Sequence, residues 1–169
     1  MGTRSRLIIY RASKRPIYLW MHWDGYFSGV GNDLCEQIKL LLEKYTIEQI
    51  NTMLDALDLK KVEEYQHFKT EDFIAFIEGK TTYGYDDCSD IAYEYTLDFG
   101  RGFLSGKGYE DESEVIRTLK FEQIKSGSKL TDSIALQGTI DVDAIVSMFA
   151  MLNADDKKKA FHKLIDMMS

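Results

Sequence analysis

The chain has 169 residues, a hydrophobic fraction of 44% and a net charge of −7 at pH 7, which predicts one acidic domain, residues 1–169, large enough to bury its own core. No stretch reaches the about 20 apolar residues that a membrane span needs, and the N-terminus lacks the apolar segment of a secretory signal. The two cysteines, Cys35 and Cys88, supply no disulfide framework. We therefore expect an intracellular protein, cytoplasmic or nuclear, that contacts no membrane.

The first fifteen residues are basic and contain no acid; their cations are Arg4, Arg6, Arg11, Lys14 and Arg15. Such an arm can reach phosphate groups, so nucleic-acid binding stays open as an alternative function. The rest of the chain is acidic and would repel a polyanion. Charged residues also protect the edge of a hairpin from pairing with other chains, and we favour that interpretation.

Two short runs rich in β-branched and aromatic residues, 6–11 and 17–23, flank a turn and predict a β-hairpin. In the second run Ile17, Leu19, Met21 and Trp23 face one way and Tyr18, Trp20 and His22 face the other. Because both sets are bulky, we expect this strand to be central and covered on both sides.

Three helices follow at helical spacing of apolar residues. The first starts with Asn32 or Asp33 as its N-cap, the second runs over 46–57 with Thr46 as cap, and the third runs over 71–78 and ends at Gly79.

The second half predicts strands over 91–99, around 103–105 and over 115–124. A helix from Thr139 or Asp141 to Leu152 and another from Asn153 or Asp155 to the end of the chain complete the pattern. The expected fold class is α+β: a mostly antiparallel sheet of about five strands, helices packed on it, and a C-terminal helix pair.

The segment from Trp20 to Gly31 is the densest candidate site. Its loop motif comprises Gly25, Tyr26, Gly29 and Gly31, and a strand, glycine loop and helix in this order can bind phosphate. The glycines match neither nucleotide-binding fingerprint, and acidic side chains stand beside the loop. We favour a tight turn whose glycines allow positive φ or close backbone approach.

His22, Asp24 and Cys35 could form a nucleophilic site, with the carboxylate orienting the imidazole and a helix dipole activating the thiol. A small hydrolase or transferase is therefore an alternative function. The competing interpretation is a histidine and a cysteine buried in the core. We name no catalytic residue beyond these candidates, and the sequence indicates no metal site and no cofactor.

Methionines and phenylalanines concentrate in the two predicted C-terminal helices. Flexible methionines suit adaptable contact surfaces as well as irregular cores. If exposed, some of these side chains would form an interface with a partner protein or a second copy; the candidates are Met148, Met151, Phe161 and Met168.

The opening of the chain is similar to an uncharacterised family found in bacteria, fungi and large DNA viruses, including marseillevirus-like giant viruses. The residues that carry the resemblance are Met1 to Ser5, Trp23 to Tyr26 and the Ser28-Gly29-x-Gly31 stretch. Phe27 stands where that family usually has proline. The resemblance implies no activity and no catalytic residue, but it makes a viral protein, in a host cell or a virion, plausible.

With no complete catalytic constellation, we expect a non-enzymatic viral or accessory protein that acts through protein–protein binding or self-association. The hydrolase or transferase and the nucleic-acid binder remain the two alternatives. A cavity that brings His22, Asp24 and Cys35 together would favour the enzyme.

Overall fold

The computed structural model describes residues 2–59, 67–81, 83, 90–137 and 149–168. The chain forms two compact units, residues 1–135 and 136–169. The expectation of one domain over 1–169 stays a prediction.

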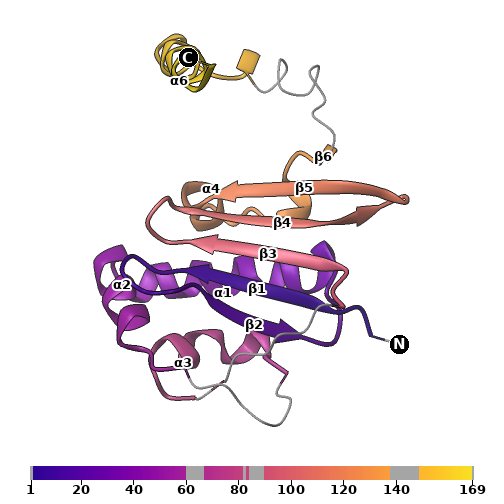
Figure 1. The fold of residues 1–169 in the computed structure, drawn as a ribbon, viewed down its shortest axis with the longest axis vertical. Coiled ribbons are helices and arrows are strands. Elements are labelled where there is room, and N and C mark those ends of the chain that lie inside the picture. The colour runs from indigo at the N-terminus through magenta and orange to yellow at the C-terminus, as the bar shows by residue number, and fades with distance from the viewer. Residues whose placement is uncertain (1, 60–66, 82, 84–89, 138–148, 169) are drawn as a thin grey trace. The chain divides into compact units, whose positions relative to one another are not determined.

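Five strands of the first unit form one sheet in the order β2-β1-β3-β4-β5 (Figure 1). Neighbouring strands are antiparallel except for β1 and β3, which are parallel. The predicted α+β class with a mostly antiparallel sheet is therefore confirmed. The strands are Ser5–Tyr10 (β1), Ile17–Met21 (β2), Tyr93–Asp98 (β3), Phe103–Glu110 (β4) and Ser113–Lys120 (β5).

The N-terminal hairpin is confirmed, but β2 lies at the edge of the sheet and not in its centre. Strand β1 is the interior strand of the hairpin, because it pairs with β2 on one side and with β3 on the other. Ile17, Leu19 and Met21 are buried as expected. Trp23 is 64% exposed, because the strand ends at Met21 and the alternation of faces ends with it.

Two predicted strands differ from the structure. The strand expected around 103–105 extends to Glu110, and its two glycines explain the missed length: a Cβ at Gly106 would lie 2.9 Å from Phe27 and Tyr95, and one at Gly108 would lie 2.1 Å from the Tyr93 ring. The strand expected over 115–124 is wrong beyond Lys120. Residues Phe121–Lys125 form a short helix, α4, whose Phe121 and Ile124 are buried.

The helices of the first unit largely follow the predicted spacing. Thr46 caps α2 through a capping box with Gln49. The expected cap at Asn32 or Asp33 is wrong, because α1 continues directly from a π-helical turn and has no side-chain cap. The bounds are Phe27–Gly31 (η1), Asn32–Lys44 (α1), Ile47–Ala56 (α2), Thr70–Asp72 (η2), Phe73–Ile77 (α3) and Leu130–Asp132 (η3).

The core lies between the sheet and α1, which lies behind β1 and β3 in Figure 1. Helix α1 contributes Leu34, Ile38 and Leu41, all fully buried, and the sheet contributes inward residues from each of its five strands. Burial of side chains of this size stabilises the fold by about 1.5 to 3 kcal/mol each. The sheet and α1 therefore form the rigid frame that carries the site.

The second unit contains a two-residue strand, Leu136–Gln137 (β6), and the helix Ala154–Met168 (α6). Helix α6 is the second of the two predicted C-terminal helices. The first, ending at Leu152, falls largely on 138–148, outside the described residues. In the described parts of the chain, no helix has the length and apolar character needed to cross a membrane.

Candidate functional site

The backbone after β2 folds back against β1. Asp24 adopts a left-handed conformation, with φ 52°, and the amide of Gly25 then donates a hydrogen bond of 3.0 Å to the carbonyl of Thr3. A Cβ at Gly25 would lie 2.7 Å from that carbonyl oxygen. Glycine is therefore required here by close backbone approach, while the positive φ of the turn falls on the neighbouring aspartate.

The turn into α1 is packed around Asp24. The Asp24 carbonyl accepts a hydrogen bond of 2.8 Å from the amide of Val30, and a Cβ at Gly29 would lie 2.2 Å from the same oxygen. The Tyr26 hydroxyl donates to Asp24 Oδ1 at 2.7 Å, and this hydrogen bond to a carboxylate raises the pKa of Tyr26. The Asp24 carboxylate is therefore held at a fixed place on the surface.

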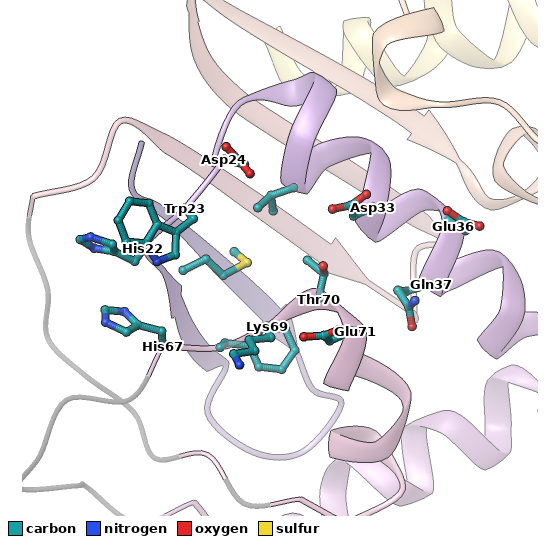
Figure 2. Close-up of a pocket in the computed structure, with 13 residues that line it drawn as sticks. His22, Trp23, Asp24, Asp33, Glu36, Gln37, His67, Lys69, Thr70 and Glu71 are labelled. Atoms are coloured by element: carbon teal, nitrogen blue, oxygen red, sulfur yellow. The ribbon is translucent and has the colours of Figure 1, made fainter. Parts of the chain in front are cut away.

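A surface cavity of about 460 Å³ opens beside this turn. Figure 2 shows His22, Trp23 and His67 on one side of it and the α1 residues Asp33, Glu36 and Gln37 on the opposite side. We call it the acidic pocket. Its lining is Met21, His22, Trp23, Asp24, Val30, Asp33, Glu36, Gln37, His67, Phe68, Lys69, Thr70 and Glu71.

The pocket carries a strong excess of negative charge. Four carboxylates line it, those of Asp24, Asp33, Glu36 and Glu71. Lys69 is the one Lys or Arg in the lining. Within the described ranges, none of the four carboxylates forms an ion pair. Partial burial, followed by repulsion from Glu36 and Asp24, raises the pKa of Asp33. This arrangement favours a cation in the cavity.

Aromatic rings form the wall opposite the carboxylates of α1. The ring of His22 lies edge-on to Trp23, with centroids 4.4 Å apart, and 4.8 Å from the ring of His67. His67 also stacks on Trp20 at 4.4 Å. Burial, followed by the nearby His22 and Arg4, lowers the pKa of His67. At neutral pH this wall therefore offers π faces to a ligand, and His67 adds no charge to it.

A second cavity, of about 440 Å³, lies against the same two residues, His22 and Trp23. It is lined further by Gly2, Thr3, Ala92 and the ion pair between Arg4 and Asp90, whose charged atoms are 2.6 Å apart. Trp23 and His22 thus belong to both cavities, and the exposed Trp23 borders each of them. An extended ligand could contact both hollows at once.

The structure does not bring Cys35 to this site. Its thiol is buried and lines a different cavity, with Lys39, Ile124 and Lys129 among its neighbours. Burial raises the pKa of Cys35 to about 11. His22 and Asp24 share the acidic pocket, and Cys35 lines neither this pocket nor the second cavity beside Trp23.

The predicted basic residues do not form one patch. Arg4 pairs with Asp90, and Arg6 pairs with Glu94. Arg11 donates hydrogen bonds to the carbonyls of Leu54 and Leu57 at the end of α2, at 3.3 and 3.1 Å. Three of the five cations are therefore engaged in contacts within the chain, and Lys14 and Arg15 remain on the exposed turn of the hairpin.

Of the candidate interface residues, Met151 is 77% exposed and Phe161 is 57% exposed. Met148 and the side chain of Met168 lie outside what the structure describes. Ile165 is exposed one turn after Phe161 on α6. Self-association through these side chains stays a prediction.

Four residues that line the acidic pocket were not among the candidate site residues predicted from the sequence. They are Asp33, Glu36, His67 and Glu71. The i, i+3 spacing of Asp33 and Glu36 places them on one helix face, a signal that could have been used. His67 and Glu71 gave no such signal, because long-range contacts bring their segment to β2; one of them is the hydrogen bond of 2.7 Å that the Phe68 amide donates to the Trp20 carbonyl.

No group of three or more His, Cys, Asp or Glu side chains within the described ranges could hold a metal ion. No family model, curated protein or solved structure matches the chain. The resemblance of its opening segment to the uncharacterised family therefore stays a prediction, and the site has to be interpreted from its own chemistry.

Proposed function

We propose that this protein is a binding module, and that its acidic pocket takes a basic segment of a partner protein. The observation that carries the proposal is the set of four carboxylates around one cavity, with a single lysine to oppose them. A lysine or arginine side chain placed between α1 and the His67–Glu71 segment would neutralise charges that have no ion-pair partner within the described chain. The loss of mutual repulsion would favour the complex.

A peptide segment suits the arrangement of the site. The two cavities share His22 and Trp23, so one extended segment that crosses these two residues can contact both. Trp23 is 64% exposed and lies where such a segment would cross from one cavity to the other. Exposed tryptophans of this kind are common hot spots, because they bury a large area at little entropic cost.

Two further properties favour a basic protein partner over a nucleic acid. The pocket and the chain as a whole are acidic and would repel phosphates, and Arg4, Arg6 and Arg11 are engaged within the fold. The enzyme alternative loses the nucleophile that the sequence proposed for it, because Cys35 is buried in another cavity with a raised pKa.

The experiment uses a fluorescein-labelled peptide of alternating arginine and alanine, followed by fluorescence anisotropy at low salt. We expect Glu36→Gln to weaken binding about fivefold, since it removes one unit of charge from an exposed site. The matched control is Glu43→Gln, because Glu43 is an exposed acid on the same helix that lines neither cavity. It should leave binding within about twofold of the wild type.

Trp23→Ala tests the aromatic component and should weaken the same peptide by about tenfold or more. Tyr109→Ala is its control, because Tyr109 is an exposed aromatic residue on β4 that lines neither cavity. Equal losses for Glu36→Gln and Glu43→Gln would mean that the peptide senses only the net charge of the chain. That result, or binding that ignores Trp23, would overturn the proposal.

A further inference from the structure

We propose a second, separate binding site for a small organic anion, at the end of the sheet where β3 turns into β4. A cavity of about 610 Å³ lies there, within the size range of small-molecule sites. We call it the basic groove. The residues that carry the argument are Phe99, Arg101, Phe103, Lys120, Phe121 and Lys125.

The fold fixes the position of two of these side chains. Phe103 and Lys120 are directly paired residues of β4 and β5, so their side chains leave the sheet on the same face. Thr118 precedes Lys120 by two residues, lies on the same face and lines the groove as well. An aromatic residue and a lysine therefore start from neighbouring positions on rigid strands.

The turn that carries Arg101 is also held in place. Its amide donates to Asp98 Oδ1 at 2.8 Å, and the Gly102 amide donates to the Asp98 carbonyl at 2.8 Å. The Gly102 carbonyl in turn accepts from the Phe121 amide at 2.9 Å. The groove is thus bordered by backbone that is already hydrogen-bonded, and little ordering is needed when a ligand binds.

The charge of the groove is opposite to that of the chain. Three cations line it against one carboxylate, Glu122, in a protein of net charge −7. Lys120 and Lys125 form no ion pair with any described residue, and the contact of Arg101 with Asp98 is long, at 3.8 Å, on an arginine that is 82% exposed. Several positive charges around one cavity favour the binding of an anion there.

The floor of the groove is apolar. The rings of Phe99 and Phe121 lie 5.4 Å apart and are buried, while Phe103 and Ile47 are partly exposed and line the hollow. An apolar floor under a cationic rim suits a ligand with both properties. We infer that the ligand class is an aromatic or branched apolar group that bears a phosphate, a sulfate or a carboxylate.

Phenyl phosphate is the probe, titrated into the ¹⁵N-labelled full chain and followed by amide chemical shifts. We expect saturable shifts at the amides of Gly100, Gly102 and Phe121, which border the groove. Lys120→Gln should weaken the binding about fivefold, and so should Lys125→Gln, because each removes one cation. The matched control is Lys107→Gln, since Lys107 lies on β4, pairs with Glu114 and does not line the groove.

Two comparison probes separate charge from shape. Inorganic phosphate lacks the ring and benzyl alcohol lacks the charge, so both should bind at least about tenfold more weakly than phenyl phosphate. Equal binding of inorganic phosphate would overturn the inferred ligand class. Shifts that map to Lys14 and Arg15 on the N-terminal hairpin, or an equal effect of Lys107→Gln, would overturn the site itself. Neither result would bear on the acidic pocket.

Discussion

At the scale of single residues, the environment of Cys35 decides what its thiol can do. The side chain is 3% exposed and packs in the core between α1 and the segment around Leu130. Burial in apolar surroundings disfavours the thiolate, which is the reactive form of the side chain. A cysteine in the first turn of a helix is therefore not activated by its position alone.

This environment predicts that Cys35 reacts slowly in the folded protein. A pKa of about 11, against an ordinary 9.0, leaves a thiolate fraction about a hundredfold smaller at pH 7.5. We expect iodoacetamide to modify Cys35 at least about a hundredfold more slowly in the native protein than in urea, measured by peptide mass spectrometry so that Cys88 is counted separately. A native rate within about tenfold of the unfolded rate would contradict this and would return the thiol to the list of candidate nucleophiles.

At the scale of elements, the turn between β2 and α1 depends on contact distances more than on glycine φ angles. The φ of Gly29 is not positive, so alanine would fit its backbone conformation. The obstacle is the Asp24 carbonyl, 2.2 Å from where a Cβ would stand. That carbonyl is fixed by its hydrogen bond to Val30 and cannot move without opening the turn.

Gly29→Ala should therefore lower the free energy of unfolding by about 1 to 3 kcal/mol, the usual cost of forcing an extra methyl group into packed structure. Urea unfolding followed by tryptophan fluorescence measures it. Gly100→Ala is the control, because its nearest contact is the Asp98 side-chain oxygen at 3.3 Å, and we expect it to cost less than about 0.5 kcal/mol. Equal costs for the two variants would show that the turn relaxes easily.

The elements also show which parts of the fold can be predicted from the sequence. The hairpin, α1, α2 and β3 have alternating or helical apolar spacing, and Thr46 adds a cap signal for α2; these local signals are strong. Strand β4 was predicted too short because Gly106 and Gly108 weaken a local strand signal. In the fold those glycines are needed by the aromatic rings that cover them, which is a property of tertiary packing.

The candidate site, like the fold, could be predicted from the sequence only in part. The segment from Trp20 to Gly31 is conspicuous in the sequence, and it does border the acidic pocket. Its partners His67 and Glu71 are more than 35 positions away in the chain, and long-range contacts bring their segment close, among them the hydrogen bond between Phe68 and Trp20 and the stacking of His67 on Trp20. Local patterns cannot predict such a contact, so the sequence indicated one side of the pocket and missed the other.

At the scale of the whole molecule, charge is distributed unevenly between two hollows of the first unit. The acidic pocket carries four carboxylates and one lysine, and the basic groove carries three cations and one carboxylate. A net charge of −7 conceals this contrast. Opposite local potentials would let one small chain bind a basic partner and an anionic ligand at separate places.

The acidic pocket also predicts how binding depends on pH. His67 faces His22 and Trp20, with Arg4 nearby. The pKa of His67 is lowered from 6.5. Its imidazole is therefore neutral at pH 7.5 and becomes a cation only when the pH falls below 6.5. The pKa of Asp33 is raised from 3.8, so this carboxylate begins to lose its negative charge earlier on acidification than an ordinary aspartate. Both changes make the pocket less negative.

Binding of the arginine–alanine peptide should accordingly be constant above pH 7 and weaken progressively as the pH falls below 6.5, because the pocket gains positive and loses negative charge. Anisotropy at constant ionic strength measures this dependence. His67→Gln removes one of the titrating groups, so the variant should lose less affinity over the same range, while its affinity at pH 7.5 stays close to that of the wild type. Binding that strengthens on acidification would contradict the assignment of the cation site, because a basic ligand cannot gain from a pocket that is becoming positive.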